Sequence, residues 1–203
     1  MSGVLITAFE PYDRWSENSS WLALVELTRS LPASPKVVTR RYPVDFEKAK
    51  ERLSEDLAAG YDYVLHLGQA PGIGRIHLEA FGLNVGGQSS QLPDEFAPLL
   101  ADGPAAYRSP LPLARWAAKM RDEGIPAQVS HHAGTYLCNA VLYLSQHIAA
   151  QRRLTTRSTF IHLPLAPEQV LGERQDLPSL PSATCAAGIQ IILSELGQAQ
   201  SEI

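Results

Sequence analysis

The chain has 203 residues, a hydrophobic fraction of 45%, a charged fraction of 19% and a formal net charge of −4 at pH 7. These values suit one globular domain over residues 1–203, and they give no electrostatic reason to expect nucleic acid or an anionic membrane as a partner. No signal peptide pattern and no long apolar span occur, so we expect a cytoplasmic protein without a membrane partner. Cys138 and Cys185 are the only cysteines, which excludes a disulfide framework.

The first third of the chain alternates short apolar runs with helical patterns. Strands are expected at residues 4–9, 36–42 and 61–67. Ser19 or Ser20 is expected to cap a helix that ends near Leu31, with Leu22, Val25 and Leu27 facing inward. Asp45 should cap a second helix that Gly60 ends. Residues 9–20 form a loop of mixed aromatic and polar side chains, typical of either a pocket wall or a surface turn.

Residues 75–84 alternate as a strand does. Ile76, Leu78 and Ala80 fall on one side, and Glu79 falls on the other. Such a carboxylate is either an edge charge that points to water or a functional group, and the pattern favours neither. A loop rich in Gly, Gln, Ser and Pro follows at about 85–103, which indicates a lid, a binding loop or a disordered segment.

The second half of the chain continues the alternation. Helices are expected at 113–123, from the cysteine to about residue 151, shortly after Pro167 and from Ser182; strands are expected at 125–130 and 158–164, and a frayed tail at 198–203. This order predicts an α/β fold whose central sheet carries helices on both faces.

Cys138 follows a turn of small residues, Ala133-Gly134-Thr135, and precedes an apolar helical pattern. With Thr135 as the N-cap, the free N–H groups of the first turn would stabilise a thiolate. Alternatively, Cys138 is a small buried apolar residue. His162 lies at the end of its strand, so it could meet the cysteine at one edge of the sheet.

Motifs for other chemistries are missing from the sequence. The six histidines show no metal-ligand spacing, and neither a phosphate-binding loop, a complete dinucleotide fingerprint nor a serine nucleophile elbow occurs. We therefore expect no metal and no cofactor.

Several segments, in order along nearly the whole chain, resemble the pyroglutamyl peptidase I (pyrrolidone-carboxylate peptidase) family. They include Leu5–Tyr12, His66–Ala70 and Leu78–Asn84; the most specific are Ala133–Asn139 and Phe160–Pro164. The resemblance implies a three-layer α/β/α sandwich with a twisted, mostly parallel or mixed sheet, often assembled as a homotetramer.

The same resemblance implies a cysteine exopeptidase that removes an N-terminal pyroglutamyl residue from peptides. It carries the triad Cys–His–Glu over to Cys138, His162 and Glu79. The substrate pocket is carried over to Phe9 and Tyr12 of the first loop, and Gln69 lies in the substrate region. Hydrolysis would pass through an acyl-enzyme, with His162 as base and then acid.

The chain departs from the family pattern at two places. Tyr12-Asp13-Arg14 stands where Phe-Gly-Gly is usual, and residues 85–91 lack an arginine that the family commonly carries shortly after Asn84. Two alternatives therefore stay open: a related thiol amide hydrolase with altered pocket specificity, and a non-catalytic binding relative.

Overall fold

The structure is a computed structural model that describes residues 3–88, 91–172 and 176–201. A six-stranded sheet with the order β2-β1-β3-β8-β4-β7 forms its centre. β2, β1, β3 and β8 run parallel, whereas β4 pairs antiparallel with β8 and parallel with β7. The strands are β1 Gly3–Phe9, β2 Lys36–Tyr42, β3 Tyr63–Gln69, β4 Ile76–Glu79, β7 Ala127–Ser130 and β8 Arg157–Leu163.

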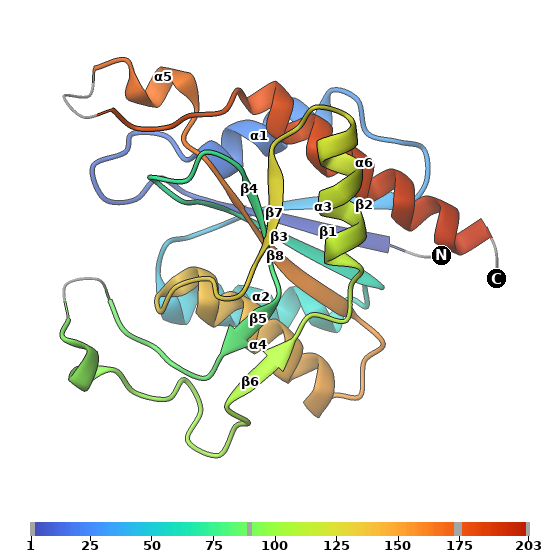
Figure 1. Ribbon diagram of the computed structural model, residues 1–203. Coiled ribbons are helices and arrows are strands. Elements are labelled where there is room, and N and C mark those ends of the chain that lie inside the picture. The colour runs from blue at the N-terminus through green and yellow to red at the C-terminus, as the bar shows by residue number, and fades with distance from the viewer. Residues whose placement is uncertain (1–2, 89–90, 173–175, 202–203) are drawn as a thin grey trace.

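Helices cover both faces of this sheet (Figure 1). One apolar cluster joins the sheet to α1 (Ser19–Thr28), α3 (Leu113–Asp122) and α6 (Ser182–Ser201). A second cluster on the opposite face joins it to α2 (Phe46–Ala58) and α4 (Leu137–Gln151). The expected three-layer α/β/α sandwich with a mixed, mostly parallel sheet is therefore confirmed. None of the helices in the described ranges is long and apolar enough to cross a membrane.

Three smaller elements complete the chain. β5 (Phe81–Leu83) and β6 (Ala106–Arg108) form a separate antiparallel pair that lies against α4, and α5 (Pro167–Val170) is a short helix after β8. The approach of β5 to α4 is close, because a Cβ on Gly82 would come within 2.7 Å of the Tyr143 backbone nitrogen. Only glycine fits there.

Several local predictions are confirmed. Asp45 caps α2 and accepts a hydrogen bond from the Lys48 N–H at 2.9 Å. Gly60 follows the end of α2 with φ of 77°, a left-handed conformation that glycine adopts without steric cost. The expected strand at 36–42 has the predicted bounds.

The cap and inner face of α1 are corrections. Asn18, not Ser19 or Ser20, is the N-cap, and its side chain accepts from the Ser20 N–H. Val25, expected to face inward, is 39% exposed, and Ala23 and Leu24 are buried instead. Asn18 takes the cap position because its side chain also donates a hydrogen bond to the Glu10 carbonyl, and this bond closes the first loop.

Residues 75–84 are not one strand but two. Ala80 separates the two strands. Its N–H donates to the Ser130 carbonyl, and its carbonyl accepts from the Ser109 N–H. β4 stays in the main sheet and β5 leaves it. Glu79 is therefore not an edge charge: β4 lies between β8 and β7, and Glu79 is 1% exposed.

The long segment 85–103 is anchored at both ends. Gly86 and Ala97 form a two-way backbone bridge, and the Asn84 side chain bonds to backbone groups of Leu100 and Gly103. A short 3₁₀ turn, Pro93–Glu95, lies within it, and residues 89–90 lie outside the described ranges. At the other end of the chain, α6 continues to Ser201, past the start of the tail expected at 198–203; residues 202–203 are also outside these ranges.

Candidate active site

Cys138 is the second residue of α4 and is partly exposed. The N-cap is Tyr136, not Thr135 as the sequence suggested. The Thr135 hydroxyl donates instead to the carbonyl of Gly87, a residue 48 positions away, at 3.2 Å. The first backbone bond of α4 runs from the Ala140 N–H to the Tyr136 carbonyl. The amides of residues 137–139 therefore precede the intrahelical ladder and point their N–H groups toward the thiol end of the helix.

His162 and Glu79 meet inside the sheet. The imidazole Nδ1 of His162 lies 2.8 Å from Oε1 of Glu79, and the two residues are 8% and 1% exposed. They come from the adjacent antiparallel strands β8 and β4, whose register pairs Glu79 with Phe160. Because Glu79 occupies Nδ1, the nitrogen of His162 that is left for the thiol of Cys138 is Nε2.

The electrostatics of this group favour a protonated imidazole. Burial alone would lower the pKa of His162, but the charge of Cys138 and the hydrogen bond and charge of Glu79 outweigh it and raise that pKa to about 9. An imidazolium between a carboxylate and a sulfur stabilises negative charge on the sulfur. The three side chains can thus act as nucleophile, acid–base group and orienting carboxylate.

Gly68 lets β3 approach the thiol. A Cβ on this residue would lie 2.5 Å from the ring of Phe160 and 3.3 Å from the Cys138 Sγ. The first distance is far below van der Waals contact, so any side chain would displace Phe160 from beneath the site. The strand pattern of β3 marks Gly68 only as the approach to a turn, so the sequence pattern does not reveal this close contact.

A cavity of about 230 Å³ opens beside Cys138. Its walls are mostly aromatic and aliphatic, and among the residues that line it none is acidic or basic. They are Phe9, Tyr12, Asn18, Val44, Gly68, Gln69, Tyr136, Leu137 and Cys138. The predicted pocket residues therefore all line the cavity that the cysteine faces.

Phe9 and Tyr12 form one wall of the cavity. Phe9 is 3% exposed and stacks on Phe160 with ring centroids 6.0 Å apart. The Tyr12 hydroxyl lies 3.5 Å from the Gln69 carbonyl, and burial, followed by the charge of Cys138, raises its pKa to about 12. Tyr12 is thus a neutral phenol at ordinary pH. Asp13 takes φ of 53°, the left-handed conformation that aspartate tolerates better than most residues.

The Gln69 side chain is engaged with protein groups. Its Oε1 accepts from the Ser19 N–H and from the Gln169 Nε2, both at 2.8 Å. Gln169 Nε2 also lies 3.0 Å from the Glu17 carbonyl. Gln69 and Gln169 therefore hold the loop that carries Tyr12 against β3 and α5. Gln169 was missed because its partner is 100 residues away and no local pattern marks it.

The sequence pattern of the pyroglutamyl peptidase family matches residues 2–198. The chain belongs to the pyroglutamyl peptidase family. A pyrrolidone-carboxylate peptidase of Streptomyces coelicolor is 37% identical over all of this chain and 95% of its own length. One from Bacillus cytotoxicus is 33% identical over all of this chain and 96% of its own.

Solved structures agree with the family. The pyrrolidone carboxyl peptidase of Fervidobacterium islandicum matches with a TM-score of 0.91 and 30% identity, and the match covers 98% of this chain and 99% of that one. The Thermococcus litoralis protein matches with a TM-score of 0.90 and 28% identity, over 100% and 96%. The proposed nucleophile, acid–base and carboxylate residues of this family member therefore lie together on a fold shared with those peptidases.

Proposed function

We propose that this chain hydrolyses the amide bond that follows an N-terminal pyroglutamyl residue of a peptide. The proposal assigns Cys138 as nucleophile, His162 as the acid–base group and Glu79 as the carboxylate that orients His162. The observation that carries it is the buried Nδ1–Oε1 contact of 2.8 Å between His162 and Glu79, beside an uncharged cavity that Cys138 faces.

The proposed reaction has two steps. The Cys138 thiolate attacks the scissile carbonyl carbon, and the imidazolium of His162 donates its Nε2 proton to the leaving amine as the C–N bond breaks. A water then gives a proton to the now neutral His162 and attacks the thioester carbonyl carbon. The C–S bond breaks, which releases the pyroglutamyl acid and restores the thiolate of Cys138 beside the imidazolium of His162. Backbone N–H groups at the start of α4 are positioned to donate hydrogen bonds to the oxyanion in both steps.

The cavity suits a pyroglutamyl group because the lactam is small and uncharged. A free α-ammonium placed against Phe9, Tyr12 and Leu137 would lose its hydration without gaining a carboxylate partner, since none of the lining residues is acidic. That loss costs on the order of several kcal/mol, which explains a preference for the blocked N-terminus.

A related thiol amide hydrolase with different specificity is the second candidate. The Tyr12 hydroxyl favours it, because it adds a hydrogen-bonding group at the cavity wall, 3.5 Å from the Gln69 carbonyl. A ligand with a carbonyl at that place could accept from Tyr12 in competition with Gln69.

The decisive assay compares hydrolysis of a pyroglutamyl chromogenic amide with hydrolysis of prolyl and alanyl amides by the same protein. We expect turnover of the pyroglutamyl amide only, its loss in Cys138→Ala, and its loss after treatment with a thiol alkylator. Preference for the prolyl or alanyl amide supports the second candidate. Absence of turnover together with slow alkylation of Cys138 points to the non-catalytic relative and refutes the proposal.

Two broader expectations belong to the same proposal. Cys138 and Cys185 are both free thiols, which supports a reducing compartment such as the cytoplasm. Family membership supports assembly as a homotetramer, which light scattering of the purified protein tests directly.

A further inference from the structure

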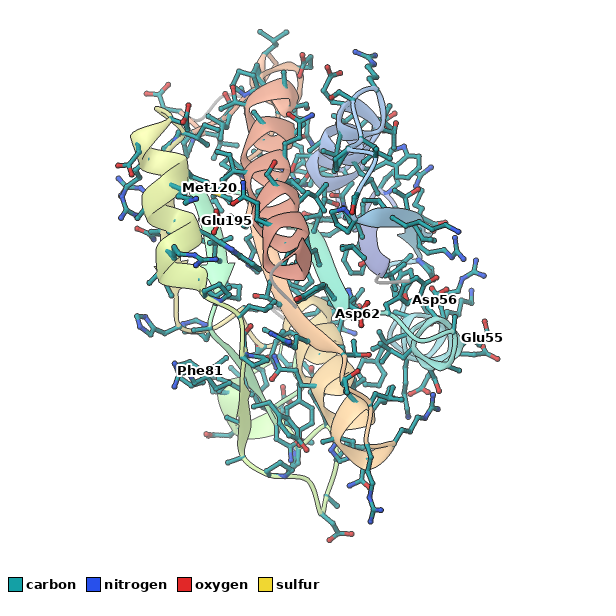
Figure 2. The ribbon with its side chains drawn as sticks, turned by 90° about the vertical axis from the view of Figure 1, so that its right-hand side faces the viewer. Glu55, Asp56, Asp62, Phe81, Met120 and Glu195 are labelled. Carbon is teal, nitrogen blue, oxygen red and sulfur yellow. The ribbon has the colours of Figure 1, made fainter. Side chains whose placement is uncertain are left out.

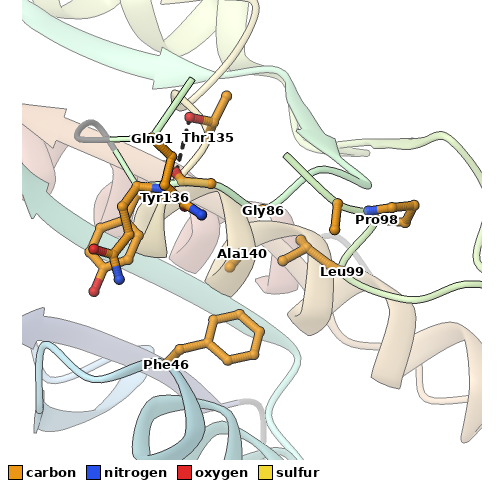
Figure 3. A pocket seen from close by; sticks show the side chains of 11 residues that line it. Phe46, Gly86, Gln91, Pro98, Leu99, Thr135, Tyr136 and Ala140 are labelled. Carbon is orange, nitrogen blue, oxygen red and sulfur yellow. Dashed lines mark hydrogen bonds between the residues drawn. The ribbon is translucent and has the colours of Figure 1, made fainter. Parts of the chain in front are cut away.

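A second hollow lies between α2, the start of α4 and the chain at residues 86–88 and 97–99 (Figure 3). Its volume is about 270 Å³. Phe46 of α2 forms one side, and Leu99 and Pro98 form the other, with Ala140 of α4 between them. Nothing in the reaction proposed above uses these side chains.

This hollow is a neighbour of the cavity beside Cys138, because the two share a lining residue. Tyr136 lines both, and it also lines an intermediate hollow of about 450 Å³. The intermediate hollow shares Tyr12 and Val44 with the Cys138 cavity and shares Gln88 with the second hollow. Through these shared residues the three hollows adjoin one another in a row, from the thiol of Cys138 to Phe46 and Leu99, and we call this row the trench.

The end of the trench is built to hold an apolar group. Gly87 donates its N–H to the Thr135 carbonyl and accepts from the Thr135 hydroxyl, and Gly86 is bridged in both directions to Ala97. The backbone N–H and C=O groups of Gly86 and Gly87 are thus already paired. Phe46 and Leu99 remain partly exposed on the apolar cluster beneath α2 and α4. Such a surface gains free energy when a ligand side chain covers it.

We propose that this hollow binds an apolar side chain of the leaving peptide, at the first or second residue after the scissile bond. The inference rests on the proposed function. No residue precedes a pyroglutamyl residue in a peptide. Only the part of the bound substrate after the scissile bond therefore extends beyond the Cys138 cavity. The hollows past Tyr136 adjoin that cavity through shared lining residues, and an extended peptide advances about 3.3–3.6 Å per residue.

Three peptide amides test the proposal: pyroglutamyl-Gly-Gly, pyroglutamyl-Leu-Gly and pyroglutamyl-Gly-Leu. We expect the wild-type kcat/KM for one of the leucyl peptides to exceed that for the glycyl peptide by about tenfold, the usual effect of a side chain in a half-open apolar pocket. Leu99→Gln should reduce this ratio to under about twofold and leave the glycyl peptide unaffected. Phe46→Gln, from the opposite wall, should do the same and replaces Leu99→Gln if that variant does not fold.

Leu92→Gln is the matched control, because Leu92 lies in the same segment, is 68% exposed and lines none of the three hollows. It should keep the wild-type ratio. Equal rates on all three peptides, or a leucine preference that survives in both wall variants, overturns this proposal alone. Absence of turnover on all three peptides refutes the proposed function and this proposal with it.

Discussion

Glu79→Gln is the most informative substitution at the site. It keeps the size of the side chain and removes the charge that lies 2.8 Å from the His162 Nδ1. A hydrogen bond to a charged group is worth about 1.5–3 kcal/mol, and one pKa unit corresponds to 1.36 kcal/mol. The substitution should therefore lower the pKa of His162 by roughly one to two units, from about 9 to about 7–8.

The sign of the pH effect follows from the role of His162. The imidazolium must hold its proton until the leaving amine takes it, so kcat/KM falls as pH rises through the pKa of His162. In the wild type, the alkaline limb of the profile should lie near pH 9. In Glu79→Gln, it should move to about pH 7–8.

The substitution should also slow the reaction below that limb. The glutamine can present its carbonyl to Nδ1–H, which buries an unpaired NH₂ at the place where Glu79 Oε2 has no hydrogen-bond partner in the part of the chain that the structure describes. Alternatively, it presents the NH₂ and favours the wrong imidazole tautomer. Both cost about 1–3 kcal/mol, which corresponds to roughly a 5- to 150-fold loss of kcat/KM.

A pH profile of kcat/KM on the pyroglutamyl amide measures both effects. The control is Glu195→Gln, since Glu195 is also a buried carboxylate, 6% exposed, but bonds to Lys119 and Arg115 between α3 and α6 (Figure 2). This control should lower Tm by a few degrees and leave the profile unchanged. A folded Glu79→Gln variant with the wild-type alkaline limb and rate would refute the assignment of Glu79.

Three further substitutions or treatments test the site. Iodoacetamide at pH 7.5 should label Cys138 well before Cys185, because Cys185 is 2% exposed and burial raises its pKa to about 12; equal labelling in a peptide map contradicts this. Tyr12→Phe should change kcat/KM on the pyroglutamyl amide by less than about threefold, because the hydroxyl makes only a long 3.5 Å contact; a tenfold loss would show that the hydroxyl binds substrate. Gly68→Ala should lower both Tm and kcat, because the new methyl group meets the Phe160 ring; retention of both would show that Phe160 can move without disturbing the thiol.

Local sequence patterns predicted most of the helices and strands, because the signals for each element lie within its own short segment. The apolar periodicity of α2, its Asp45 cap and its terminal Gly60 are all properties of one short segment. The position of Cys138 near the start of a helix was predictable for the same reason. The N-cap was not, because the hydroxyl of Thr135 bonds to Gly87, and that partner is set by the tertiary fold.

Glu79 shows where local reasoning ends. Alternation within 75–84 placed its side chain opposite the apolar set, but whether that side meets water depends on the neighbouring strands. β8 follows β4 by nearly 80 residues in the chain and pairs with it antiparallel, whereas it pairs parallel with its other neighbour, β3. No periodicity in either strand encodes that pairing. Only the resemblance joined Glu79 to His162 before the structure was known.

The departures from the family pattern lie in loops, whose contacts depend on residues that are far apart in the chain. The first loop carries Tyr12 and Asp13, and the segment after Asn84 has no arginine up to Gln91. Within that segment, the side chain that lines two of the three hollows is Gln88. The proposed nucleophile and its two proposed partners are held by sheet and helix, which tolerate few alternatives. The trench is walled by loops, whose side chains can change without disturbing the core. Substitutions in these loops that leave Cys138, His162 and Glu79 intact should therefore change which peptides are cleaved more readily than they abolish cleavage.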